Sequence, residues 1–203
     1  HQSFGLNARD AVNQDAQGWL REGWMDMLFP MMYFDGKHFY PFAVNWQEHC
    51  NGRPVVPGLG IYFLDAREKD WEVQRVVRQI NFTRQMGMGG QAYFRSRFLL
   101  NNVKGVLDYV TDAYQQPALS PAMTWRDSIA PASPKWKSEI VGQTLRLSWQ
   151  PVADNTPVVY NIYRLSPYGA QSVAHHLRNT SFDYTPALPT RLHDVYAVVA
   201  MDA

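Results

Sequence analysis

The sequence predicts an α/β unit with a parallel sheet, followed by an all-β sandwich. Three apolar, strand-like runs alternate with amphipathic stretches in the first part of the 203-residue chain. Strands that alternate with helices favour a parallel sheet covered on both faces. After the Pro- and Ala-rich segment 128–134, the pattern changes to short runs of alternating polarity. This change predicts a domain boundary with a short extended linker.

The first unit is expected to contain helices and strands in alternating order. The predicted helices span 7–21, 39–49, 70–86 and 99–114, and the predicted strands span 25–34, 55–63 and 90–96. Trp19 lies on the apolar face of the first helix, where we expect it to be buried, and Gly23 is placed to end that helix. Asp70 is the expected N-cap of the third helix. Pro41 belongs in the first turn of the second helix or outside it.

Three parallel strands are too few to close a barrel, so we expect this unit to be part of a larger one. Its outer strands and apolar sheet face would lie open to water until another segment covers them. The expected partner is a missing amino-terminal half of the sheet or a second copy of the chain. The chain begins at His1, without an initiator Met or the layout of a signal peptide, and is expected to be a piece of a longer protein.

The second unit shows the pattern of a β-sandwich. Polar and apolar residues alternate over 143–149, 158–164, 172–177 and 195–201. Turn residues separate these runs at Asp154-Asn155, at 167–169 and at Pro186. Several short strands at this spacing are typical of two packed antiparallel sheets.

Composition and motif spacing exclude several classes of function. The net charge is +1 and the basic residues are scattered, which argues against nucleic-acid binding. No apolar run reaches the length of a membrane-spanning helix, and the single Cys50 cannot form an internal disulfide. We expect no cofactor, because Gly87, Gly89 and Gly90 end a helix instead of opening one as a phosphate-binding loop does.

We also expect no metal site, because neither histidine motif brings enough ligands together. The neighbouring His175 and His176 lie on a predicted strand, where adjacent side chains point to opposite faces. His49 and Cys50 have no third and fourth ligand at a usable spacing.

The second unit resembles a fibronectin type III domain. The resemblance lies in the Ala-Pro entry at 130–134, in Leu145–Trp149, in Tyr160–Arg164 and in Tyr196. It implies a buried core position for Trp149 and a tyrosine-corner role for Tyr196. The resemblance also implies that the last strand of the fold is missing after Ala203, which would leave an unpaired edge.

The first unit resembles the carboxyl-terminal half of the barrel in the glycosyl hydrolase-like 10 family, which comprises secreted bacterial proteins common in gut Bacteroidetes. The residues that carry the resemblance are Ser3–Gly5, Gln14-Asp15, Trp19-Leu20, Gly23–Asp26, Pro30–Tyr33, Gly58–Tyr62, Trp71 and Pro117–Trp125. Met31 and Met32 depart from the family, which often keeps a polar residue there. The resemblance implies half of a (β/α)₈ (TIM) barrel over 1–127, a linker at 128–134 and the sandwich over 135–203. It also implies an extracellular, periplasmic or cell-surface protein that acts on polysaccharide or another glycan.

In a (β/α)₈ barrel the working residues lie at the carboxyl ends of the strands. Glycoside cleavage uses two carboxyl groups, and the strand ends supply Asp35 and Asp65 as the only pair. Asp35 can equally belong to a turn, and Asp65 to a solvated loop. The resemblance places the family's acids after the fourth strand, in the half that this chain lacks, so we expect the isolated chain to be catalytically incomplete. Asp15 matches a family position, and we expect it to be an N-cap or helix-face residue.

Aromatic rings suit carbohydrate binding because the C–H face of a sugar packs on them. The candidates are Tyr33, Trp46, Tyr62 and Trp125, each of which can instead be a packing residue. Arg97 is a candidate for binding the carboxylate of an acidic sugar, or for pairing with a helix residue such as Asp108. Two functions follow from these residues. One is a glycoside hydrolase in the intact parent, and the other is a non-catalytic carbohydrate-binding or scaffold module.

Overall fold

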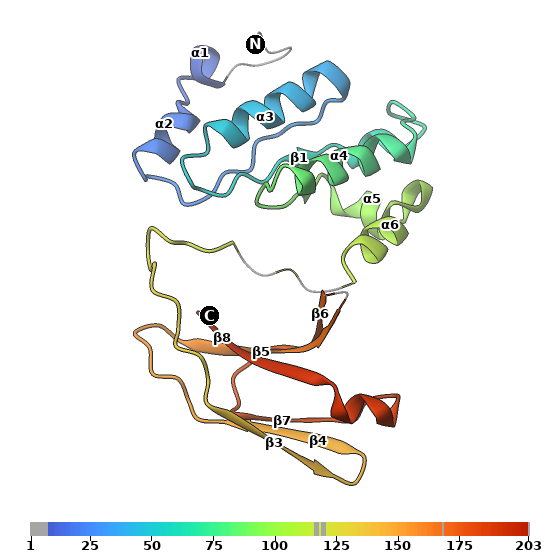
Figure 1. Ribbon diagram of the computed structural model, residues 1–203. Helices are drawn as coiled ribbons and strands as arrows, with labels where there is room; N and C mark the ends of the chain where they lie inside the picture. Colours follow the sequence, from blue (N-terminus) through green and yellow to red (C-terminus); the bar gives the residue numbers. More distant parts are fainter. Residues whose placement is uncertain (1–7, 116–117, 119–120, 168, 203) are drawn as a thin grey trace. The chain divides into compact units, whose positions relative to one another are not determined.

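The computed structural model describes residues 8–115, 118, 121–167 and 169–202 (Figure 1). It divides the chain into two compact units, His1–Met123 and Thr124–Ala203. Each unit has its own cluster of buried apolar residues. Part of the closing motif at 117–125 lies outside the described residues, as does Ser3–Gly5.

Unit 1 consists of short helices that surround very short strands. Its elements are α1 (Ala8–Val12), α2 (Ala16–Arg21), the 3₁₀ helix η1 (Gly36–His38), α3 (Tyr40–Glu48), β1 (Gly58–Leu59), η2 (Ile61–Leu64), α4 (Val73–Gln85), β2 (Ala92–Tyr93), α5 (Ser96–Leu100), η3 (Val103–Gly105) and α6 (Val106–Ala113). Pro41 lies in the first turn of α3, where its missing N–H leaves no hydrogen bond unmade.

Three extended segments lie side by side in chain order, and all run in the same direction. β1 pairs in parallel with β2, and parallel bridges join Leu28 to Val55 and Met31 to Gly58. The ladder continues past the strands, since the N–H of Phe94 donates to the carbonyl of Leu59 at 2.9 Å. The pairing is shorter than the predicted runs. Pro30 lies within the first run and cannot donate to a ladder, and residues 61–63 of the second run form η2 instead of a strand.

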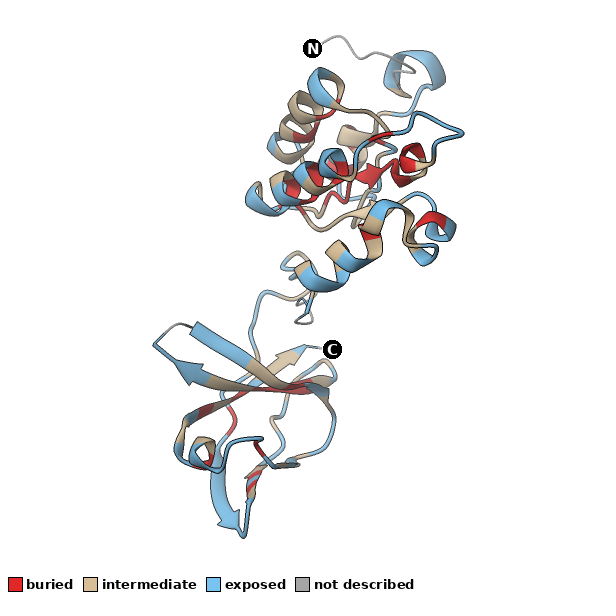
Figure 2. Ribbon diagram, turned by 90° about the vertical axis from the view of Figure 1, so that its right-hand side faces the viewer, coloured by how far each residue is buried: buried red, intermediate tan, exposed pale blue. Residues whose placement is uncertain are grey.

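The core of unit 1 forms where the helices meet these segments (Figure 2). Leu20, Phe39, Leu59, Ile61 and Ile80 are almost completely buried. Trp19 is only half-buried, so its predicted core role is wrong. Its neighbour on α2, Leu20, fills that position instead.

The predicted amino-terminal helix is broken into α1 and α2 because Asn13 adopts the left-handed region, with φ of 54°. Asp15 then caps α2, as predicted, by accepting a hydrogen bond from the N–H of Gly18 at 3.2 Å. Gly23, with φ of 73°, follows the end of that helix.

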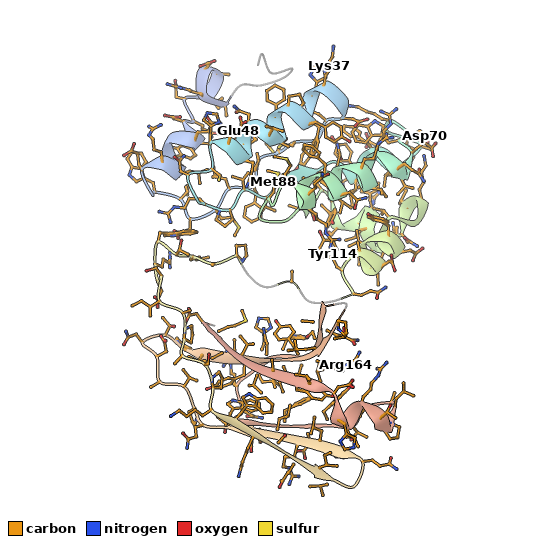
Figure 3. All side chains as sticks on the ribbon, viewed as in Figure 1. Lys37, Glu48, Asp70, Met88, Tyr114 and Arg164 are labelled. Atoms are coloured by element: carbon orange, nitrogen blue, oxygen red, sulfur yellow. The ribbon has the colours of Figure 1, made fainter. Side chains whose placement is uncertain are left out.

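The predicted helix over 70–86 is confirmed as α4, but its predicted cap is wrong. The N-cap position belongs to Glu72, and Asp70 adopts a φ of 49°. The carboxylate of Asp70, which is labelled in Figure 3, lies 2.7 Å from the ammonium nitrogen of Lys104. This ion pair ties the start of α4 to η3.

The predicted helix over 99–114 is interrupted. Asn102, Lys104 and Gly105 all have positive φ, which separates α5 from α6. The side-chain oxygen of Asn102 accepts hydrogen bonds from the N–H groups of Leu107 at 2.9 Å and Asp108 at 3.2 Å. Asn102 thereby provides a hydrogen-bond acceptor for the free N–H groups in the first turn of α6 and stabilises the break between the two helices.

Unit 2 consists of two three-stranded antiparallel sheets that share one core (Figure 1). One has the order β3-β4-β7 and the other β6-β5-β8. The strands are β3 (Trp136–Val141), β4 (Thr144–Trp149), β5 (Val158–Ser166), β6 (Gly169–Leu177), β7 (Ser181–Tyr184) and β8 (Val195–Asp202), with η4 (Pro189–His193) before β8. Four of the strands coincide with predicted runs, whereas β3 and β7 were not predicted.

Two aromatic residues occupy the core positions expected of them. Trp149 is buried on β4 and lies against Tyr160, with ring centroids 5.2 Å apart. The hydroxyl of Tyr196 donates to the carbonyl of Arg191 at 2.6 Å, which ties β8 to η4. Asp194 lies between η4 and β8 and forms an ion pair at 2.9 Å with Arg164 of β5, which is labelled in Figure 3.

A bulge in β6 overturns the expected geometry of the two histidines. His176 has φ of 53°, the register shifts opposite it, and the Nδ1 atoms of His175 and His176 lie 3.3 Å apart. The two side chains therefore do not point to opposite faces. The side-chain oxygen of the buried Asn161 accepts a hydrogen bond from the N–H of His176 at 2.8 Å. This N–H group therefore has a hydrogen-bond partner within the distorted part of the strand.

In the described part of the chain, no helix combines the length and the apolar character needed to cross a bilayer.

Candidate functional site

The carboxyl ends of the three parallel segments bring three aromatic rings into contact. Tyr33 follows the first segment, Tyr62 follows β1 and Phe94 follows β2. The ring centroids of Tyr33 and Phe94 are 5.0 Å apart and stacked, while Tyr62 meets both rings edge-on at 6.0 and 5.7 Å. We call Tyr33, Tyr62 and Phe94 the aromatic triad.

Glycines in the second segment make room for the triad. A Cβ atom on Gly58 would lie 3.0 Å from the ring of Tyr33, and one on Gly60 would lie 3.1 Å from the Cβ atom of Tyr33. Larger residues at these two positions would push the Tyr33 side chain away from the strand ends. The sequence Gly-Leu-Gly therefore serves the site by letting Tyr33 lie across β1.

The two phenols of the triad stay protonated at neutral pH. Desolvation by burial raises the pKa of both Tyr33 and Tyr62 above the ordinary tyrosine value, and the nearby charge of Glu68 raises the pKa of Tyr62 further. A protonated phenol can donate one hydrogen bond and accept others. The triad therefore combines apolar ring faces with two neutral hydroxyl groups, a combination that suits an uncharged hydroxyl-rich ligand.

Both candidate carboxylates are bound to arginines. Asp35 accepts a hydrogen bond from the guanidinium of Arg75 on α4 at 2.7 Å. Asp65 receives two from the guanidinium of Arg67, at 3.0 and 2.8 Å, and another from the Arg67 N–H at 2.9 Å. These hydrogen bonds hold the pKa of Asp65 well below its usual range. Asp65 is therefore ionised at neutral pH and lacks the proton that a general acid must carry.

Replacing Arg67 with alanine is expected to raise the pKa of Asp65 toward about 3.9, the value of a free aspartate. Because the folded-state pKa is depressed, the Asp65 carboxylate stabilises unit 1 above the unfolded pKa. That stabilising contribution is lost only as pH falls through the lowered pKa of Asp65 in the folded state. Carboxyl-carbon NMR titration measures this directly. Arg78→Ala, an exposed change on α4, is the matched control and should leave the Asp65 titration unchanged. An unaltered Asp65 titration in Arg67→Ala would contradict the assignment.

The structure brings together only two of the predicted sugar-binding residues, Tyr33 and Tyr62. Trp46 lies on α3 and packs against the core. Arg97 is exposed on α5, next to the strand end of β2, and its guanidinium lies over the ring of Phe98. Trp125 belongs to unit 2. The prediction overlooked Phe94, whose signal was its place at the end of the third strand-like run.

Two further features do not include the triad residues. A cavity of about 210 Å³ lies near the amino ends of the parallel segments, where Cys50, Pro54 and Gly87 are among its lining residues. In unit 2, ligand atoms of Asp127, Asp154 and Asp202 lie within 4.8 Å of one another. Thr156 donates to both Asp154 and Asp202, so hydrogen bonds already occupy part of this cluster.

Comparison with known proteins relates the chain to a glycosyl hydrolase. No family model matches the sequence, and no solved structure matches it. A curated relative, the glycosyl hydrolase YngK of Bacillus subtilis (strain 168), is 31% identical over 141 residues. The match covers 64% of this chain and 28% of the relative, so it spans less than a third of the relative's length.

Proposed function

We propose that the chain supplies a sugar-binding rim to a glycoside hydrolase that acts on polysaccharide or another glycan. The observation that carries this proposal is the contact of Tyr33, Tyr62 and Phe94 at the carboxyl ends of three consecutive parallel segments. In parallel barrels this end holds the substrate. The sequence similarity to a glycosyl hydrolase also supports this proposed function.

At finer detail, we propose a member of the glycosyl hydrolase-like 10 family in which unit 1 is the carboxyl-terminal half of a (β/α)₈ barrel. Parallel pairing in chain order supports this assignment. For unit 2 we propose a fibronectin type III-like domain, supported by the two sheet orders and by the hydrogen bond from Tyr196 to Arg191. The family resemblance further suggests an extracellular, periplasmic or cell-surface location.

The exposed face of the first segment supports a partner that completes the sheet. Leu28 and Met32 pack into or against the core, whereas Phe29 and Met31, which alternate with them, are 58% and 74% exposed. Apolar side chains this open to water favour a covering segment. We propose that the amino-terminal half of the barrel covers them in the intact protein, with a second copy of the chain as the alternative.

Catalysis needs a proton donor and a second carboxylate. Asp35 and Asp65 are held by Arg75 and Arg67, so the proposal assigns the reacting carboxyl groups to the rest of the intact protein. The same ion pairs favour the second candidate function, a non-catalytic module that holds glycan without cutting it.

Phe94→Ala is expected to weaken glycan binding by the full chain by about fivefold to thirtyfold, because removing one stacking ring costs on the order of 1–2 kcal/mol. Affinity electrophoresis in gels containing soluble polysaccharides measures the effect. Trp24→Ala is the matched control, since Trp24 is 73% exposed and precedes the first segment, at its amino end. Equal retardation of both variants would contradict the proposed rim.

Release of reducing ends separates the two candidate functions. The hydrolase proposal expects none from this chain alone and release after the rest of the parent protein is restored. The binding-module alternative expects retardation in the gel and no reducing ends in either case.

A further inference from the structure

Two arginines that carry no ion pair in the described part of the chain follow Phe94 of the aromatic triad. Arg95 directly follows Phe94 as the N-cap residue of α5, and Arg97 is the second residue of that helix. Both residues are exposed. Their guanidinium carbons lie 5.5 and 5.1 Å from the ring centroid of the same residue, Phe98.

The ring of Phe98 is a fixed support for both cations. Its side chain is only 2% exposed and belongs to the core of unit 1. A guanidinium that packs on an aromatic face keeps its N–H groups directed outward and loses less freedom when it binds an anion. The two like charges are thus held near one ring at the end of β2.

The surrounding acids leave the charge of this rim unbalanced. Asp65 is neutralised by Arg67, and Asp70 by Lys104. Glu68 and Glu72 are the other two acids on the loop between η2 and α4, against three cations in this region, Arg95, Arg97 and Lys69. The ammonium nitrogen of Lys69 lies 3.8 Å from the ring centroid of Phe63. The charge of Arg97 also contributes to the lowered pKa of Asp65, the carboxyl group that follows η2.

We propose that the rim recognises an anionic saccharide, in which a sugar ring packs on the triad while its carboxylate binds Arg95 and Arg97. This inference rests on the proposed function and narrows its substrate class to acidic glycans. A planar carboxylate fits the guanidinium fork through two parallel hydrogen bonds, whereas a sulfate ester offers the same charge with a different shape. A carboxylated sugar is therefore the favoured ligand.

The test uses the full chain and two matched probe pairs in isothermal titration calorimetry. Oligomers of polygalacturonate are compared with the same oligomers after complete methyl esterification, which keeps the sugar and removes the charge. Dextran sulfate is compared with dextran, so that carboxylate and sulfate are distinguished. The protein variants are Arg95→Gln/Arg97→Gln and the control Arg78→Gln, whose exposed arginine lies on α4.

We expect polygalacturonate to bind about tenfold more tightly than its methyl ester, and the difference to shrink as salt is raised. The double variant should lose this preference while binding the ester unchanged, and Arg78→Gln should keep it. Equal binding of charged and esterified oligomers would overturn the acidic-glycan inference and leave the proposed function standing. Tighter binding of dextran sulfate than of polygalacturonate would overturn the carboxylate assignment. Absence of binding to every probe would overturn both the acidic-glycan inference and the proposed sugar-binding function.

Discussion

Replacing Phe39 with alanine is expected to lower the free energy of unfolding of unit 1 by about 3–5 kcal/mol. Phe39 is completely buried and is the largest of the fully buried side chains. It is the N-cap residue of α3 and contacts Tyr40, which in turn packs edge-on against Phe82 of α4 at 5.0 Å. Truncation would therefore leave a cavity between the two helices that flank the parallel segments, and these surroundings can close it only in part.

Thermal and urea unfolding followed by circular dichroism measure this loss. Trp19→Ala is the informative comparison, because Trp19 is larger than Phe39 but only half-buried. We expect it to cost less than Phe39→Ala, since an exposed surface loses less hydrophobic burial when it is truncated. A larger loss in Trp19→Ala than in Phe39→Ala would contradict the burial pattern.

Leu147→Ala is expected to destabilise unit 2 by about 2–5 kcal/mol and to leave unit 1 unchanged. Leu147 is completely buried on β4, the central strand of its sheet, where it faces the core shared with the second sheet. Val141→Ala on β3 is the matched control. Val141 is 55% exposed, so its truncation should cost no more than about 0.5 kcal/mol.

Differential scanning calorimetry resolves the two units if their cores are independent. None of the described residues belongs to both core clusters, so Leu147→Ala should shift one transition and Phe39→Ala the other. A single transition that moves equally with either substitution would contradict the separation into two units.

Periodicity located most of the elements of unit 1 but not their interruptions. The three-four spacing of Val76 and Ile80 identified α4 because burial of one helix face leaves a repeated apolar signal. The break at Asn13 depends on one residue in the left-handed region, and the break that begins at Asn102 depends on three. An apolar periodicity does not indicate that conformation. Short polar side chains can satisfy the backbone there, which a periodic pattern does not register.

The candidate site was predicted in part because strand ends are visible in sequence. Tyr33 and Tyr62 lie at the ends of the predicted strand runs, and the carboxyl ends of parallel strands meet at one edge. Trp46 was expected at the same edge because it lies in a predicted loop-helix segment that could reach it, but it lies on α3 and packs against the core. The arginine partners of Asp35 and Asp65 could not be derived from the chain pattern. Arg75 lies 40 positions from Asp35 and reaches it only because α4 packs beside the first segment.

The most direct test of the account is to observe the rings of unit 1 by NMR while a soluble glycan is added. Aromatic side-chain spectra, with assignments from Tyr33→Phe, Tyr62→Phe and Phe94→Leu, report which rings the sugar contacts. The account predicts chemical-shift changes and saturation transfer at Tyr33, Tyr62 and Phe94, with the Trp46 signal unchanged. Glycan-induced changes confined to Trp46 or to the rings of unit 2 would contradict it.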